Sequence, residues 1–320
     1  MKSRQINHIA ALFALSLGLV LIGRQAVWAG PSPASEGVDP TPISSCGTLS
    51  GNNTIYQLTQ NINTSSTGNC IVLGGSDNTL DLQGFNITFT GAAGASKGAG
   101  LFIESTANED VVEGSNSTIS GFQEGVLDEG ANTVGDDINC GPNTVGLELA
   151  GSDSTEIWTN FSADSNTAQG VYLKSCGDEC TISDFDASNN GADGVLITGS
   201  EGPRVSIFQA TQNGGDGVHV GCSSSKCSGG NNSEVKVGDA PIGFAGGAAL
   251  TGNAGDGLFL DKSESTAQDQ IFLTFASGNG GIDLHDANNT CGDNHWVHNQ
   301  FGTAEAGTTP NPSCIPNVPF

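Results

Sequence analysis

The sequence predicts an all-β solenoid, a parallel β-helix whose coils are each about 23 residues long. Three observations predict this fold: one short phrase recurs at a near-constant interval, the phrase alternates apolar and polar residues, and glycine is abundant. The clearest copies are NNGADGVLI at 189–197, QNGGDGVHV at 212–220 and GNAGDGLFL at 252–260. With 47 glycines and one methionine among 320 residues, the chain is poorly suited to long helices.

The repeat can be traced through a glycine that precedes each short apolar triplet. Successive glycines are separated by 25, 21, 24, 24, 23, 40 and 24 residues, and the long interval indicates one coil with an insertion of about 17 residues. A unit this short cannot bury its own apolar face, so the units must stack on one another. The aligned glycines are Gly100, Gly125, Gly146, Gly170, Gly194, Gly217, Gly257 and Gly281.

A second strand is expected upstream of these glycines, because an apolar stretch with a phenylalanine precedes several of them. Phe161, Phe185 and Phe208 lie 24 and 23 residues apart. Each is followed five residues later by an asparagine: Asn166, Asn190 and Asn213. Asparagine and glycine tolerate the bent backbone between strands. Because stacked strands lie about 4.8 Å apart, we expect a ladder of phenylalanines in the core and a ladder of asparagines at the turns.

From about Gly47 to Phe301, the chain resembles the right-handed parallel β-helix family, the pectate-lyase-like superfamily. The resemblance rests on the repeat length, the Asn-Gly turns and strands of the form GV-x-[IV], as in GVLI and GVHV. It implies a right-handed coil. Members of this superfamily include polysaccharide lyases, glycoside hydrolases, epimerases, esterases and non-catalytic surface proteins, so the fold alone does not fix an activity.

The first 29 residues have the pattern of a secretory signal peptide. MKSR supplies a basic start, residues 9–23 an apolar run too short for a membrane span, and AVWAG a cleavage site after Ala29. We therefore expect a secreted protein, extracellular or periplasmic, with no membrane span after cleavage. The expected organisation is a signal peptide at 1–29, a flexible segment at 30–45, a parallel β-helix at 46–301 whose last coil is covered by Trp296 and Phe301, and a disulfide-tethered tail at 302–320.

The mature chain is strongly acidic. Removing Lys2, Arg4 and Arg24 with the signal leaves six basic residues against 34 acidic ones, a formal charge of about −28. Nucleic acid is excluded as a partner, because phosphate binding needs clustered cations. This acidity has two interpretations. One is solubility outside the cell. The other is that some of the carboxylates hold a hard cation such as calcium.

Nine cysteines in an exported chain indicate disulfides. A zinc site at CGDEC or CSSSKC lacks a second pair of ligands at zinc-finger spacing. Closeness in sequence suggests four pairs and leaves Cys140 over, although sequence does not fix connectivity. The suggested pairs are Cys46 with Cys70, Cys176 with Cys180, Cys222 with Cys227, and Cys291 with Cys314.

Asp193, Asp216 and Asp256 each precede an aligned glycine, so stacking should bring them one above another. Like charges about 5 Å apart repel by roughly 3 kcal/mol at an effective dielectric of 20, so these carboxylates must face water or share a cation. Calcium between them is one interpretation. Solvated turn residues that accept backbone hydrogen bonds are the other.

Two segments suggest epimerase or lyase chemistry. DLHD at 283–286 resembles the Asp-Pro-His-Asp motif of mannuronan C5-epimerases, with Leu284 in place of proline, which implies catalytic roles for Asp283, His285 and Asp286. The neighbouring tyrosine of that family is missing. In pectate lyases the base is an arginine, and Arg204 is the only arginine of the mature chain. For all four residues a structural role in strand or closing segment is the alternative.

Other polar clusters are weaker hypotheses. Asp136 and Asp137 are similar to the paired acids of polygalacturonase-type hydrolases, but Gly-His-Gly and Arg-x-Lys motifs are absent. His285, His295 and His298 have the composition of a transition-metal site, yet the alternation in NHWVHNQF puts His295 on the face opposite Trp296. His219 lies between two valines, so it should point outward and contact any substrate on that face.

Together these features predict an exported, monomeric β-helix protein that binds extracellular polysaccharide. Whether it also acts as a lyase, epimerase or hydrolase stays open at this point. A non-catalytic cell-surface or matrix protein is the alternative, and the scarcity of lysine and arginine favours it, because uronate-active members of the superfamily rely on these residues.

Overall fold

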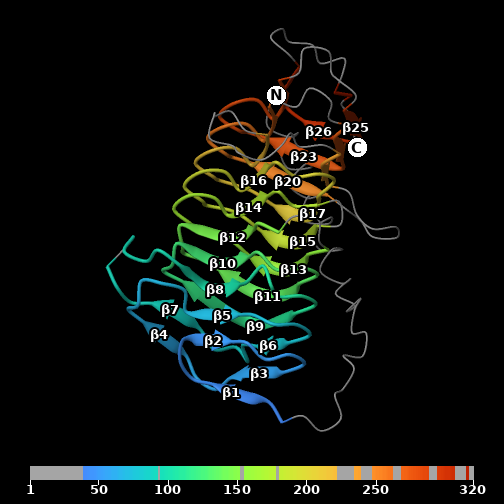
Figure 1. Cartoon of the computed structure of the whole chain (residues 1–320). Coiled ribbons are helices and arrows are strands. Elements are labelled where there is room, and N and C mark those ends of the chain that lie inside the picture. The colour runs from blue at the N-terminus through green and yellow to red at the C-terminus, as the bar shows by residue number, and fades with distance from the viewer. Residues whose placement is uncertain are drawn as a thin grey trace, which may run out of the picture. The chain divides into compact units, whose positions relative to one another are not determined.

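The structure is a computed structural model and describes residues 39–92, 94–151, 155–177, 180–221, 234–238, 247–261, 268–287, 294–306 and 315–316. In these ranges all regular elements are β-strands, and strands paired in a sheet run parallel. Figure 1 shows the strands stacked in chain order, from β1 in blue to β23 and β26 in orange and red. Each coil therefore contributes strands to two sheets that face each other across a core.

The first sheet has eleven strands, and each pairs with the strand of the next coil. Its order follows the sequence throughout, as a solenoid requires. The strands are β2 (Gly47–Leu49), β5 (Ile71–Leu73), β8 (Ala99–Ile103), β10 (Glu124–Asp128), β12 (Val145–Leu149), β14 (Val171–Lys174), β16 (Val195–Thr198), β18 (Val218–Val220), β21 (Leu258–Leu260), β24 (Leu284–Asp286) and β27 (Ala304–Ala306).

The second sheet has sixteen strands and divides after β17, where both β19 and β20 pair with it. The strands are β1 (Thr41–Ile43), β3 (Ile55–Leu58), β4 (Ile62–Thr64), β6 (Thr79–Asp81), β7 (Ile87–Phe89), β9 (Val111–Ser120), β11 (Val134–Cys140), β13 (Ile157–Ser162), β15 (Thr181–Asp186), β17 (Arg204–Gln209), β19 (Lys236–Val237), β20 (Ala248–Thr251), β22 (Gln270–Phe272), β23 (Thr274–Ser277), β25 (His295–Val297) and β26 (Gln300–Phe301).

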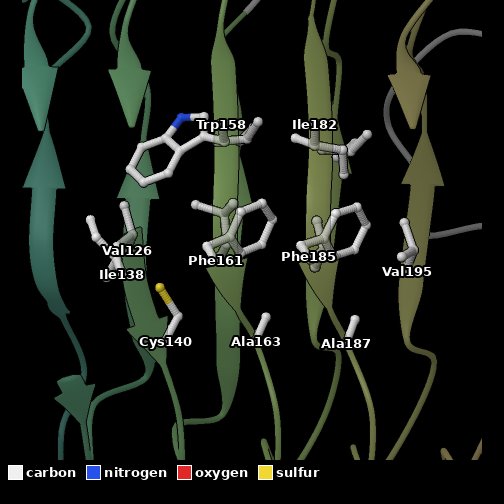
Figure 2. Close-up of a cluster of buried hydrophobic side chains, with 14 of the residues drawn as sticks. Val126, Ile138, Cys140, Trp158, Phe161, Ala163, Ile182, Phe185, Ala187 and Val195 are labelled. Carbon is white, nitrogen blue, oxygen red and sulfur yellow. The ribbon is translucent and has the colours of Figure 1, made fainter. Parts of the chain in front are cut away.

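The predicted phenylalanine ladder is present in the core. The rings of Phe161 and Phe185 lie 4.8 Å apart and those of Phe185 and Phe208 4.9 Å apart, with an interplanar angle of 2° in both pairs. Figure 2 shows the first two rings in line on neighbouring strands, with Trp158 and Ile182 above them. Stacking at the strand spacing explains why the sequence repeats one aromatic residue in register.

The asparagine ladder is also confirmed, and it is longer than predicted. From Asn166 onward, each side-chain oxygen accepts from the backbone N–H of the asparagine one coil earlier, as between Asn190 and Asn213 at 2.9 Å. A Cβ atom at Gly194 would lie 2.7 Å from the Asn213 amide nitrogen, so the turn needs glycine there. The ladder consists of Asn143, Asn166, Asn190, Asn213, Asn253 and Asn279.

The predicted register fails at the last glycine. Leu258 pairs with Leu284, so the residue aligned with Gly257 is Asp283 and not Gly281. A glycine is dispensable here because the asparagine ladder ends at this coil: Asn279 donates its side-chain N–H to Asp283 Oδ1 at 2.8 Å. The sequence GIDL resembles the repeat, but its glycine lies two residues before the structurally aligned position.

Strand pairing extends beyond the predicted limits of 46 and 301. β1, which lies in the segment expected to be flexible, pairs with β3. β27, which lies in the expected tail, pairs with β24. Near the C-terminal end Trp296 is buried, while Phe301 is half-buried against the core. In the part of the chain that the structure describes, no helix is long and apolar enough to cross a membrane.

Two of the suggested disulfides are present, Cys46–Cys70 and Cys176–Cys180. Cys140 is a free, buried thiol, and Figure 2 shows it in line with Ala163 and Ala187 on the next coils. It thus fills a position for small core side chains. The other suggested pairs, Cys222 with Cys227 and Cys291 with Cys314, lie outside the described residues.

Candidate functional site

The eleven-stranded sheet carries one row of outward-pointing side chains, which we call the outer column. From β5 to β27 the pairing register places one residue per coil in this row, and each is half-buried by its neighbours. Aromatic, aliphatic, acidic and imidazole side chains all occur in it. From the N-terminal end the outer column consists of Val72, Phe102, Leu127, Glu148, Tyr172, Leu196, His219, Phe259, His285 and Glu305.

Near the C-terminal end of the outer column, two imidazole rings enclose a phenyl ring. The ring of His219 meets Phe259 edge-on at 5.0 Å, and Phe259 meets His285 at 4.9 Å. The three residues come from β18, β21 and β24, so the spacing of the coils sets these distances. They form a continuous aromatic surface three coils long.

Asp193, Asp216 and Asp256 stack beside this surface, as predicted. Asp193 Oδ1 accepts the backbone N–H of Asp216 at 2.8 Å, and Asp216 Oδ1 accepts that of Asp256 at 2.6 Å. Asp256 Oδ1 likewise accepts from Ile282 at 2.5 Å. One oxygen of each carboxylate thus joins consecutive coils, and the other, Oδ2, is left for the outer column.

These second oxygens approach the two histidines. Asp256 Oδ2 lies 2.7 Å from His285 Nδ1, and this hydrogen bond raises the pKa of His285 above its ordinary value despite the opposing effect of burial. His219 Nδ1 lies 3.4 Å from Asp216 Oδ2 and 3.8 Å from Asp193 Oδ2. His285 and Asp256 therefore form a close imidazole–carboxylate pair at the surface.

The side chains that lie close enough together to share a cation are not the predicted three aspartates. One ligand atom each from Asp193, Asp216 and His219 lies within 4.8 Å of the others. Asp256 is turned toward His285 instead. Burial, which outweighs the hydrogen bond from Asp256, raises the pKa of Asp216 to about 6, and the nearby Asp193 charge adds to this. A bound cation would relieve this repulsion.

No protein-family model matches the sequence, and no curated protein matches it significantly. The fold is nevertheless similar to known structures. The Dettilon tailspike protein aligns with a TM-score of 0.63 and 12% identity over 82% of this chain, which spans 54% of the tailspike chain. The A-modules of two Azotobacter vinelandii mannuronan C-5 epimerases, AlgE4 and AlgE6, align with TM-scores of 0.53 and 0.54 at 13% identity.

The chain is a right-handed parallel β-helix. The two epimerase modules are covered over 87% and 92% of their length, and they cover 84% and 90% of this chain. At such low identity the likeness establishes the parallel β-helix fold and no activity. The function of this β-helix protein therefore has to be argued from its own residues.

The β-helix separates the three polar residues of DLHD. His285 points outward, whereas Asp283 and Asp286 are buried. Asp283 accepts hydrogen bonds from the backbone N–H groups of Gly302 and Thr303 at 3.0 and 2.9 Å, in addition to Asn279. Asp286 accepts one from the Asn294 side chain at 3.0 Å. Both aspartates thus have the contacts of residues that close the last coils.

The remaining predicted residues do not join the outer column. Arg204 begins β17 of the sixteen-stranded sheet. Asp136 and Asp137 lie in β11 of that sheet, where Asp136 accepts from the Thr159 hydroxyl at 2.9 Å. His295 and His298 are exposed on or after β25, again in that sheet and apart from His285 in β24. His219 points outward, as expected.

Sequence reasoning missed Phe259, Tyr172 and Glu148 as surface residues. A signal for them exists: each is the second residue after an aligned glycine, in GLFL, GVYL and GLEL. Alternation alone places this second residue opposite the buried ones. This position differs from coil to coil, so the repeat itself does not mark it.

Proposed function

We propose that this β-helix protein binds polysaccharide along the outer column. The proposal is carried by the aromatic and polar side chains that line one face, coil after coil. Seven strand spacings separate Phe102 from His285, which is about 34 Å. The half-buried rings of Phe102, Tyr172 and Phe259 offer apolar faces for sugar rings, and the acids and histidines between them can accept or donate hydrogen bonds. The similarity in fold to a tailspike and to two mannuronan epimerase modules supports this choice of ligand class.

Affinity electrophoresis in gels that contain different glycans tests this proposal. We expect at least one glycan to retard the wild-type protein and Phe259→Ala to abolish most of the retardation. Ile157→Ala is the matched control, because Ile157 is an exposed apolar residue, 37% accessible, on the other sheet. Equal retardation of both variants would place binding elsewhere. No retardation by any glycan would leave the non-catalytic matrix protein as the better account.

Processing of the bound glycan is a second candidate function, and the His285–Asp256 pair favours it. An imidazole that is held by a carboxylate and whose pKa is raised can donate or accept a proton near neutral pH. Incubation with pectate, alginate and neutral glycans would be followed through absorbance at 235 nm and through reducing ends. Activity that His285→Gln removes and His298→Gln preserves would support catalysis at this pair. Activity that survives His285→Gln would contradict it.

Cation binding stays a prediction, and we propose a changed set of ligands for it. We propose Asp193, Asp216 and His219 as the cation ligands. Calcium prefers six to eight oxygen ligands, whereas an imidazole with two carboxylates suits a first-row transition ion. A thermal-shift titration with Ca²⁺ and Zn²⁺ tests both ions. We expect the larger rise in melting temperature with Zn²⁺ and its loss in Asp216→Asn; equal response of variant and wild type would reject these ligands.

We also propose that the protein is exported. The disulfides Cys46–Cys70 and Cys176–Cys180 support this, because such bonds persist in oxidising compartments. The expected signal peptide can be tested by N-terminal sequencing of the mature protein. A mature chain that begins at Gly30 is the expected result, and one that retains Met1 would contradict it.

A further inference from the structure

The charge of the outer column and its border is almost entirely negative. Besides the column's own acids, a border row lies three residues before it on each coil, next to the same surface. Only one lysine, Lys174, accompanies the acids in these two rows and on the strands that carry them. The six acids of the two rows are Glu124, Glu148, Asp193, Asp216, Asp256 and Glu305.

This negative charge is compensated only in part within the described residues, because His219 and His285 are positive only when protonated and Lys174 is the one lysine on these strands. The Lys174 ammonium lies 3.8 Å from Glu148, but its side chain is half exposed and such pairs are weak. Burial and the neighbouring Glu148 raise the pKa of Glu124, and burial raises the pKa of Glu148 although Lys174 acts in the opposite direction. The two carboxyl groups are thus partly buried and close to other acids, and Lys174 is the one lysine on these strands that opposes this effect.

We infer that the polysaccharide bound here is cationic, a polymer of amino sugars with free, protonated amino groups. This inference rests on the proposed binding function and names its substrate class. Ammonium groups would pair with carboxylates such as Glu148 and Asp216 through charge-assisted hydrogen bonds. Beside Tyr172 and Phe259 they would also gain cation–π attraction. Each sugar can thus place its ring on an aromatic face and its amine on a carboxylate.

An anionic polysaccharide fits this surface poorly. Two unit charges of like sign 4 Å apart repel by about 4 kcal/mol at an effective dielectric of 20. A polyuronate would meet such repulsion at Glu148, Asp193 and Asp256 in succession. Within the described residues of these strands, Lys174 and the protonated forms of His219 and His285 are the positive charges that offset it. A neutral glycan would avoid the repulsion and could donate hydroxyl hydrogen bonds to the carboxylates, but it would bring them no positive charge.

Matched oligosaccharides test the inference by isothermal titration calorimetry at pH 6. The probes are glucosamine oligomers, the same oligomers after N-acetylation, oligogalacturonate, and oligolysine as a polycation without sugar rings. We expect glucosamine oligomers to bind at least about tenfold more tightly than their acetylated form, and more tightly than oligolysine of equal charge. We expect oligogalacturonate to show no binding.

Two variants distinguish the effect of a charge on the outer column from the effect of the protein's overall charge. Glu148→Gln should weaken glucosamine binding about three- to tenfold. Glu113→Gln, which removes the same charge from β9 of the other sheet, should leave it unchanged. Unchanged melting temperatures of both variants would show that they are folded.

The outcomes distinguish this inference from the proposed function. Equal or tighter binding of the acetylated or anionic oligomers would overturn the cationic ligand while leaving polysaccharide binding intact. Equal losses in Glu148→Gln and Glu113→Gln, or equal binding of oligolysine, would reduce the effect to bulk charge and also overturn the inference. Binding of none of the sugars would remove both proposals.

Discussion

The interior of the β-helix and its outer column differ in how the sequence repeats. Inside, the same residue recurs in register, as with Phe161, Phe185 and Phe208 or with the asparagines at the turns. On the outer column, neighbouring coils carry different residues, such as Tyr172, Leu196 and His219. Stacking favours identical neighbours because rings and amides pair at the strand spacing. A surface freed from this requirement can vary, and variation is what recognition of a ligand needs.

The largest expected effect comes from the phenylalanine ladder. Phe185→Ala should lower the free energy of unfolding by about 3 to 5 kcal/mol, because it leaves a cavity between two stacked rings. Phe259→Ala on the outer column should lower it by less than about 2 kcal/mol, since that ring is only half-buried. Urea denaturation of both variants measures the difference. Similar losses of unfolding free energy in both variants would contradict this difference between the interior and the outer column.

Breaking the asparagine ladder should have the next largest effect. Asn190→Ala removes the acceptor for both the backbone and the side-chain N–H of Asn166, at 2.9 and 3.1 Å, and leaves two buried donors unpaired. We expect a loss of about 2 to 3 kcal/mol in the free energy of unfolding. Asn139→Ala is the control, because its side chain donates one exposed hydrogen bond. An equal effect of the two variants would show that the ladder contributes no more than a surface contact.

The interior also contains acids, and these should make stability depend on pH. Asp269 is fully buried, and burial, which outweighs the hydrogen bond from the Val235 N–H, raises its pKa to about 7. Since the folded-state pKa lies above the unfolded value of about 3.9, its stabilising contribution is complete below pH 4 and is lost as pH rises through 7.

Asp269→Asn should therefore be more stable than the wild type at pH 8 and no more stable at pH 4. Urea midpoints at the two pH values measure this. Glu305→Gln on the outer column is the control, and we expect little change at either pH. A gain for Asp269→Asn that is the same at both pH values would mean that the carboxyl group is not protonated in the folded protein.

A small stabilisation is expected at an outward-facing position of the sixteen-stranded sheet where the repeat is imperfect. Ile207 has a φ of 52°, in the left-handed region that β-branched residues avoid, while Asp184 and Asn160 occupy the same position on the preceding coils. Ile207→Asn should raise the free energy of unfolding by about 1 kcal/mol. Calorimetric melting measures it. A fall in melting temperature would show that the half-buried isoleucine contributes more through packing than its backbone strain costs.

The parts of the fold that repeat were predictable from the sequence. Phe185 and Asn190 were found because their spacing matches that of their neighbours, and stacking converts spacing into contact. The same reliance on repetition caused the error at Gly281: GIDL matches the phrase locally, but two extra residues precede Asp283 and the asparagine ladder ends there. A local sequence match to the repeat gives no information about the number of residues in the preceding turn.

The candidate site was predictable only in part. The stacking of Asp193, Asp216 and Asp256 followed from their spacing, yet the choice of His219 and His285 as their partners depends on side-chain directions that spacing does not contain. The resemblance of DLHD to an epimerase motif suggested catalytic roles for its three polar residues. The alternation of that strand buries Asp286 and exposes only His285, and this could have been inferred from period two alone.

The most direct test of the account is whether bound glycan covers the outer column. Leu196→Cys would place a thiol in the middle of the column, and Ser183→Cys would place one at a similarly half-buried position on β15 of the other sheet. Burial raises the pKa of the native Cys140 thiol to about 12, so it should not react. The rate of maleimide labelling would be measured with and without the glycan that binds best. We predict that the glycan slows labelling at position 196 and not at 183; equal rates at 196 with and without glycan, or protection at 183 alone, would contradict the account.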